Sequence, residues 1–168
     1  MDIRHLFGLR TVCNTIEKLF NPANAPFQVS GFFHANYMER IRSCQTGTKQ
    51  SWMIQGEEGS IEMASGRRTK IIGTSPKADL TLSPADVGLD ERERITVPAD
   101  VSQHVAINHA VIQGERGTAL DQVALTAGTL LSLVGSEASI PAGFSKAKKL
   151  LIDKKVSQTY DKVSAFKQ

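Results

Sequence analysis

The sequence predicts a mainly β fold, an antiparallel β-sandwich or barrel domain flanked by an N-terminal and a C-terminal helix. Near both ends of the chain, apolar residues recur at three- and four-residue steps, which is the period of an amphipathic helix. Between residues 27 and 140, short apolar segments are separated by glycine, proline, serine or aspartate, which is typical of antiparallel strands. The 168 residues suffice for one domain with a substantial core.

Composition restricts the class of protein further. Hydrophobic residues make up 40% and charged residues 22%, close to the globular average, which indicates a folded chain. No apolar run approaches the roughly 20 residues that a membrane-spanning helix needs. Charged residues in the first ten positions interrupt the apolar stretch that a secretory signal requires, so we expect cytoplasmic synthesis.

Residues 1–26 are predicted to form an N-terminal helical arm. Asp2 can cap the helix, and Pro22 and Pro26 end it, because proline biases the preceding residue away from helical dihedrals. The apolar stripe of this arm needs a surface to cover it, and four of its residues are predicted to lie in an interface with another subunit: Leu6, Phe7, Ile16 and Phe20.

Residues 27–140 are predicted to form the β-rich domain. Residues 35–43 fit either a strand or a short helix, 83–94 fit an exposed loop, and Gly128 is expected to bend the chain between two buried strands. The segments predicted as strands are 27–33, 51–55, 60–64, 69–73, 78–82, 95–97, 101–113, 118–125 and 129–134, with 51–55 and 60–64 joined as a hairpin.

Residues 141–168 are predicted to form a basic C-terminal helix or arm, with Ser145 as its cap; a last strand reaching Lys155 is the alternative. Seven lysines and two aspartates give this segment a charge of +5, whereas the other 140 residues sum to −2. The segment suits an acidic protein surface, a membrane face or nucleic acid, of which nucleic acid is not favoured. Its apolar stripe supplies further predicted interface residues: Val156, Tyr160, Val163 and Phe166.

The sequence supplies no motif from which a catalytic, cofactor or metal site can be predicted. Cys13 and Cys44 lie far apart and are expected to be free, buried thiols. His104 and His109 would point to opposite faces of a strand and could not share a metal ion. Neither a nucleophile elbow nor a glycine-rich phosphate loop is present.

The clearest candidate binding segment is basic. Arg67, Arg68 and Lys70 follow the flexible Gly66 and could bind a phosphate or a carboxylate-rich partner. The alternative is an ordinary basic turn at the protein surface.

A succession of two-residue motifs resembles the forkhead-associated domain, a β-sandwich that reads phosphothreonine. The motifs are Ile72-Gly73, Asp79-Leu80, His109-Ala110 and Gly128-Thr129, together with Asp121. Thr74 stands where that family has a phosphate-binding arginine, and Ala127 where it has an asparagine. The resemblance therefore implies β-sandwich patterning, and no functional residue is carried over.

The leading functional hypothesis is a non-enzymatic structural subunit of a large assembly, most concretely a bacteriophage-type virion component such as a capsid cement, minor capsid or neck/tail protein. It would self-associate through its terminal segments, because exposed apolar stripes mark association surfaces. The alternative is a β-sandwich binding module for an acidic or phosphorylated partner. A third hypothesis is an enzyme whose site assembles from distant residues such as His104, His109 or Asp121.

Overall fold

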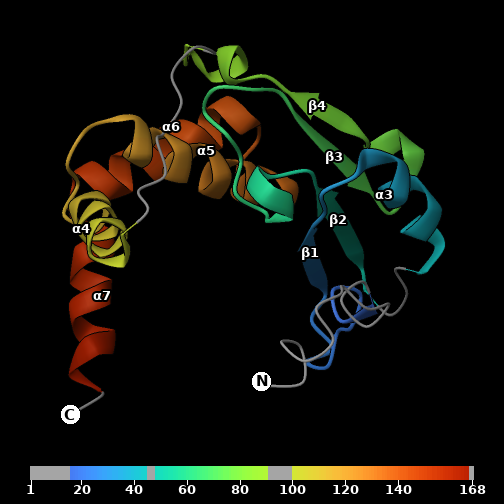
Figure 1. Ribbon diagram of the computed structural model, residues 1–168, viewed down its shortest axis with the longest axis horizontal. Coiled ribbons are helices and arrows are strands. Elements are labelled where there is room, and N and C mark those ends of the chain that lie inside the picture. Colours follow the sequence, from blue (N-terminus) through green and yellow to red (C-terminus); the bar gives the residue numbers. More distant parts are fainter. Residues whose placement is uncertain (1–15, 45–47, 91–99, 167–168) are drawn as a thin grey trace.

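The computed structural model describes residues 16–44, 48–90 and 100–166, in which a small sheet lies between two unequal helical layers (Figure 1). The short helix α3 (Ala35–Ile41) covers one face of the sheet, and helices from the second half of the chain cover the other. The strands are β1 (Phe27–Gly31), β2 (Gln50–Ile54), β3 (Thr69–Gly73) and β4 (Leu80–Leu82).

The sheet is mixed, in the order β1-β2-β3-β4. β1 and β2 run parallel with Val29 opposite Trp52, and α3 lies in the connection between them. This is a strand–helix–strand unit, because parallel neighbours need a long crossover. β2–β3 and β3–β4 are antiparallel.

The two central strands are buried on both faces. On β2, Trp52 and Ile54 pack into the larger core beneath the C-terminal helices, whereas Met53 packs against α3. On β3, Ile71 and Ile72 divide in the same way. A strand covered on both faces lacks the polar–apolar alternation of a solvent-facing sheet, so its sequence is a continuous apolar run.

The described residues 100–166 contain four α-helices. Their bounds are α4 Val101–Ile112, α5 Thr118–Leu133, α6 Ile140–Ile152 and α7 Lys155–Ala165. α5 and α6 contribute Leu120, Leu125, Phe144 and Leu151 to the larger core. α4 and α7 lie outside this pair and remain largely exposed (Figure 1).

The mainly β prediction is wrong. The strand predicted over residues 101–113 is the helix α4 (Val101–Ile112), and the two strands predicted over 118–134 are the single helix α5 (Thr118–Leu133). On α5 the buried residues are Leu120, Ala124, Leu125, Gly128 and Thr129, a helical stripe. The α/β fold that results also excludes the β-sandwich implied by the forkhead-associated resemblance, since His109, Asp121 and Gly128 all lie on helices.

Some of the other strand predictions are confirmed and some are wrong. Those at 27–33, 51–55, 69–73 and 78–82 are confirmed as β1 to β4, and the segment 35–43, which fitted either a strand or a helix, contains α3. The hairpin joining 51–55 to 60–64 is wrong, because residues 60–64 form no strand and β2 pairs with β1 and β3 instead. Residues 1–15 and 95–97 lie outside the described residues, as does Cys13. Cys44 is a free thiol, but it is exposed rather than buried.

The C-terminal helix prediction is confirmed with different bounds. Ser139, not Ser145, caps α6 through a bond from the Ala142 N–H to its hydroxyl. Lys154 adopts a left-handed conformation, φ 57°, which separates α6 from α7. Among the described residues, no helix has both the length and the apolarity needed to cross a bilayer.

Candidate functional site

The candidate site lies where the parallel strands β1 and β2 end. The carboxyl ends of parallel strands lie at the same edge of a sheet, and ligands of open α/β sheets bind in the crevice outside that edge. Here β1 leads into residues 31–34, and β2 leads into the 3-10 turn Glu57–Gly59. The Gln55 side chain links the two segments by donating to the Phe33 carbonyl at 3.1 Å.

Glycine allows these segments to pack backbone against backbone. A Cβ on Gly31 would lie 2.3 Å from the Ser60 carbonyl carbon, and one on Gly56 would lie 2.4 Å from the Ser60 oxygen. Gly59 has a φ of 78°, which favours glycine. No larger residue fits at Gly31 or Gly56 without moving the loop, so both glycines are required for this arrangement.

Lys18 joins the two strand ends. Its ammonium donates to the Gly31 carbonyl at 2.7 Å and to the Gly59 carbonyl at 3.3 Å, and it lies 5.2 Å from the centre of the Phe32 ring. The Lys18 carbonyl in turn accepts the Ser30 hydroxyl at 2.5 Å. The backbone carbonyls of Gly31 and Gly59 thereby hold the positive charge of the Lys18 ammonium at the sheet edge.

A salt bridge braces the turn after β2 from its other side. Arg67 donates through Nη2 to the Gly56 carbonyl at 3.0 Å and through Nε to the Glu57 carboxylate at 3.2 Å. The Glu57 N–H also donates to the Glu62 carbonyl at 2.7 Å. The turn is therefore held at several points, which is the pre-organisation a binding site needs.

A shallow hollow of about 570 Å³ opens beside these strand ends. Its wall combines a lysine, three uncharged polar side chains and closely packed backbone with a few apolar groups. The lining residues are Lys18, Phe20, Gln28, Val29, Ser30, Gly31, Gly59, Ser60 and Ile61. Because the Gln28 amide and the Ser30 hydroxyl donate to the backbone carbonyls of residues 18 and 20, the feature of this wall that suits an anionic ligand is the positive charge of Lys18.

Two of the three residues of the predicted basic site contact different acidic partners. Arg67 braces the turn after β2, and Lys70 of β3 pairs with Glu39 of α3 at 3.1 Å. Arg68 is exposed and also takes part in an interaction within the chain. Binding of an acidic partner by these three residues stays a prediction, and it would compete with the salt bridges of Arg67 and Lys70.

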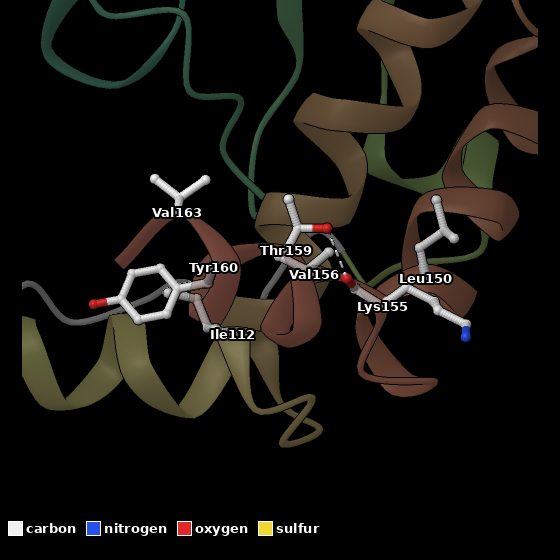
Figure 2. A pocket seen from close by; sticks show the side chains of 7 residues that line it. All are labelled: Ile112, Leu150, Lys155, Val156, Thr159, Tyr160 and Val163. Atoms are coloured by element: carbon white, nitrogen blue, oxygen red, sulfur yellow. Dashed lines mark hydrogen bonds between the residues drawn. The ribbon is translucent and has the colours of Figure 1, made fainter. Parts of the chain in front are cut away.

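Six of the predicted interface residues lie within the described chain, and all are exposed. Val156, Tyr160 and Val163 line an apolar groove of about 480 Å³ between α7 and the ends of α4 and α6 (Figure 2). Ile16, Phe20 and Phe166 lie elsewhere and do not line it, and Leu6 and Phe7 lie outside the described residues. Figure 2 also shows the Thr159 hydroxyl donating to the Lys155 carbonyl, at 3.1 Å.

The remaining candidates from the sequence lie on the helices. The His109 ring meets Tyr160 edge-on at 5.9 Å, and Asp121 pairs with Lys148 at 2.5 Å. Lys146 and Lys149 of the basic segment are also paired, with Glu137 and Asp153. These ion pairs offset much of the positive charge that the sequence places on α6.

Comparison with known proteins establishes the family. Residues 1–155 match the family described as glycosyl transferase family, a/b domain. The chain belongs to this glycosyl transferase family. A solved anthranilate phosphoribosyltransferase from Thermus thermophilus has the same fold over 98% of the chain, with a TM-score of 0.80 and 26% identity, and the chain covers 50% of it.

Curated relatives of this glycosyl transferase chain carry the same name. The anthranilate phosphoribosyltransferase of Lacticaseibacillus casei is 26% identical over 98% of the chain, and that of Xanthomonas campestris is 29% identical over 99%. The chain spans about half the length of each. A Saccharomyces cerevisiae enzyme of that name, solved in complex with PRPP and Mg, shares the fold with a TM-score of 0.75 at 17% identity and is covered to 47%.

The prediction of a non-enzymatic virion subunit is therefore wrong. The family and the relatives named above are enzymes of glycosyl transfer, and none of them is a capsid, neck or tail protein. The apolar end segments, on which the virion hypothesis depended, do not distinguish an assembly subunit from part of a larger enzyme. In both cases apolar residues need cover from chain outside the segment itself.

Sequence reasoning missed the residues of the candidate site. Lys18, Gly31, Gly56 and Gly59 are separated along the chain, and each by itself is typical of an ordinary turn or helix end. The available signal was the glycine-rich turn directly after a buried strand, combined with a helix over 35–41 that would have made β1 and β2 parallel.

The described residues do not form a magnesium cage. No group of three or more histidine, cysteine, aspartate or glutamate side chains is placed to hold a metal within them. At the strand ends, Glu57 is engaged by Arg67, and Glu58 is exposed.

Proposed function

We propose that the chain is one half of a phosphoribosyltransferase, and that the carboxyl ends of β1 and β2 form one wall of its substrate site. The match of residues 1–155 to the glycosyl transferase family carries this proposal. The names of the relatives suggest the substrates, a phosphoribosyl donor such as PRPP and an aromatic amine such as anthranilate.

The proposed reaction transfers the phosphoribosyl group from diphosphate to nitrogen. The amine nitrogen forms a bond to C1 of the ribose as the bond from C1 to the diphosphate oxygen breaks, and the amine loses a proton. Such a transfer depends on orientation of the two substrates and on neutralisation of the departing charge. The strand-end wall supports this role with a braced backbone and the ammonium of Lys18.

Lys18 has two roles in this proposal. Its bonds to the Gly31 and Gly59 carbonyls position the strand ends, and its positive charge attracts the anionic phosphoribosyl donor. The rest of the site would come from chain that this half does not span, since the relatives are about twice as long. Cytoplasmic localisation and self-association through Val156, Tyr160 and Val163 remain part of the proposal.

The test is a complementation assay. The 168-residue chain is mixed with the half of the Thermus thermophilus enzyme that it does not match, and diphosphate release from PRPP with Mg²⁺ and anthranilate is measured. We expect anthranilate-dependent release, and we expect Lys18→Met to lower kcat/KM about tenfold, because one charge-assisted contact of this kind is worth that much.

Lys49→Met is the matched control, because Lys49 directly precedes β2, its ammonium lies 6.0 Å from the centre of the Phe27 ring, and it does not line the hollow. It should leave kcat/KM unchanged. If the complementary half releases diphosphate equally well with and without this chain, the proposed function is refuted. An equal loss of kcat/KM in Lys18→Met and Lys49→Met would refute the role of Lys18.

A further inference from the structure

The loop after β2 passes beside the helical layer of α5 and α6 before the chain returns as β3 (Figure 1). Its first part, residues 56–62, forms the turn at the strand ends, and its second part, residues 63–66, is buried. Met63 lies in the larger core with 0% of its surface exposed. The loop therefore borders the candidate site with one part and packs against the helices with the next.

The tip of this loop has a backbone conformation that needs support. Glu58 and Gly59 are consecutive left-handed residues, with φ of 47° and 78°. A left-handed backbone is unfavourable for a residue with a side chain, so it persists where the surrounding contacts impose it. One such contact closes the loop behind the tip, where the Glu57 N–H donates to the Glu62 carbonyl at 2.7 Å. The position of residue 62 therefore helps to determine the conformation of the tip.

A side chain of α5 holds the loop directly after this bond. The Met63 N–H donates to the Thr126 hydroxyl at 3.0 Å, across 63 positions of the sequence. A buried N–H needs an acceptor, because the loss of its hydration is otherwise uncompensated. Here the acceptor belongs to a helix rather than to the loop, so the loop and the helix are held together at this point.

α5 is itself fixed close to this contact. Gly128, two residues beyond Thr126, packs backbone to backbone against α6, and a Cβ on it would lie 2.3 Å from the Phe144 nitrogen. Because close-packed interiors leave little room for one element to slide past another, α5 has a defined position along α6. The place of the loop is therefore set by the helical layer as well as by the sheet.

We infer that Thr126 is a positioning residue of the strand-end wall: its hydroxyl holds the loop after β2 so that Gly59 and Ser60 take their places in the hollow. Thr126 does not itself line that hollow, so it acts through the Met63 N–H. Loss of the hydroxyl should loosen the loop and leave the sheet intact. The consequence for a substrate rests on the proposed function, whereas the consequence for the loop does not.

Amide hydrogen exchange of the ligand-free 168-residue chain tests the effect on the loop. Thr126→Val keeps the shape of the side chain and removes the acceptor of the Met63 N–H. We expect the Met63 and Glu57 amides to exchange about tenfold faster in this variant, because local opening exposes both. The Phe32 amide, which donates to the Ile54 carbonyl at 2.9 Å, should exchange at an unchanged rate.

Two further variants separate this contact from a general effect of altering α5. Thr126→Ser retains the hydroxyl and should exchange like the unaltered chain. Thr129→Val is the matched control, since Thr129 lies three residues further along the same helix and its buried hydroxyl has no hydrogen-bond partner among the described residues. This variant should leave the exchange of Met63 and Glu57 unchanged.

Diphosphate release by the mixture with the complementary half of the Thermus thermophilus enzyme tests the effect on the site. We expect Thr126→Val to raise the KM for PRPP about fivefold and to leave kcat within about twofold, because a loosened wall must be ordered again as the substrate binds. A merely structural role would reduce the number of active molecules. It would lower the apparent kcat and leave KM unchanged.

Several results would overturn the inference. They are unchanged Met63 exchange in Thr126→Val, an equal effect of Thr129→Val, failure of Thr126→Ser to retain slow exchange, and faster exchange that includes Phe32. Faster exchange of the loop with an unchanged KM for PRPP would also overturn it. If the unaltered mixture releases no diphosphate, the proposed function is refuted, and the exchange of the three variants alone decides whether Thr126 holds the loop.

Discussion

Changing Gly143 to alanine should lower the free energy of unfolding by about 3 kcal/mol, because α5 and α6 cross with their backbones in contact and overpacking at such a crossing is costly. A Cβ at Gly143 would lie 2.1 Å from the Gly128 carbonyl oxygen, and one at Gly128 would lie 2.3 Å from the Phe144 nitrogen. Neither obstruction is the end of a flexible side chain, so the helices would have to separate.

Separation of these helices would disturb the larger core. Leu120 and Leu125 of α5 pack with Phe144 and Leu151 of α6 beneath the sheet. Denaturant unfolding of the variant measures the loss directly, as a shift of the midpoint at unchanged slope.

Gly135→Ala provides the control for the general effect of replacing a glycine. Gly135 follows α5 with a φ of 77°, and nothing lies within 4 Å of its added Cβ. Its replacement should cost only about 1 kcal/mol, from the left-handed backbone alone. Equal losses in the two variants would show that the α5–α6 contact is not the cause.

Changing Asp79 to alanine should lower the free energy of unfolding by about 2 kcal/mol, by leaving a largely buried arginine without its main partner. Arg42 donates to both Asp79 oxygens, at 2.8 and 2.6 Å, and the Gly73 N–H donates to the same carboxylate at 3.1 Å. These bonds tie the segment after α3 to the ends of β3 and β4. Urea unfolding at pH 7 measures the loss.

The same pair predicts a pH dependence. Hydrogen bonds from the Arg42 guanidinium, followed by the Gly73 N–H, hold the pKa of Asp79 below its usual value. Because the folded pKa lies below the unfolded value of about 3.9, the stabilisation is present above that pH and is lost as the pH falls through the folded pKa. Acid unfolding of Asp79→Asn should therefore depend less steeply on pH below about 4 than that of the unaltered protein.

Asp153→Ala is the control for loss of an ordinary surface pair. Lys149 and Asp153 form an i,i+4 pair whose side chains are 76% and 43% exposed. Its removal should cost at most about 0.5 kcal/mol. A cost as large as that of Asp79→Ala would mean that burial of Arg42 does not determine the difference.

Local patterns in the sequence predict where the strands lie better than they predict how the strands are arranged. β1, β3 and β4 are recognisable as short apolar segments between turn residues, and β2 by its run Trp52-Met53-Ile54. Their arrangement is not, because a parallel pair depends on the crossover, and residues 35–43 fit a strand as well as a helix. An antiparallel hairpin across residues 56–59 is then the simpler connection, although the same glycines build the strand-end turn.

The helices of the second half show why period alone misleads. Residues 105–111 alternate in polarity as a strand would, yet they lie on α4, which is mostly exposed and has little need for an apolar face. Asp100 at its start accepts the Ser102 N–H, a helix cap that alternation does not reveal. Gly128 does permit close backbone approach, but the approach is of one helix to another rather than a bend between strands.

The candidate site could not be predicted from local patterns for a related reason. Lys18, Gly31 and Gly59 come together only through the parallel pairing of β1 with β2 and the turn that follows β2. The basic segment at Arg67 is more visible in sequence because its charges are contiguous. In the fold, Arg67 bonds to the Gly56 carbonyl and the Glu57 carboxylate, and so stabilises the turn after β2.

The most direct test of the proposed substrate wall is the change in backbone amide chemical shifts of the labelled 168-residue chain when PRPP and Mg²⁺ are added to its mixture with the complementary half of the Thermus thermophilus enzyme. A substrate wall at the ends of β1 and β2 predicts the largest changes at Gly31, Gly59 and Ser60, reduced by Lys18→Met and absent from α7. Changes confined to the groove at Val156 and Tyr160, or none at saturating PRPP, would contradict it.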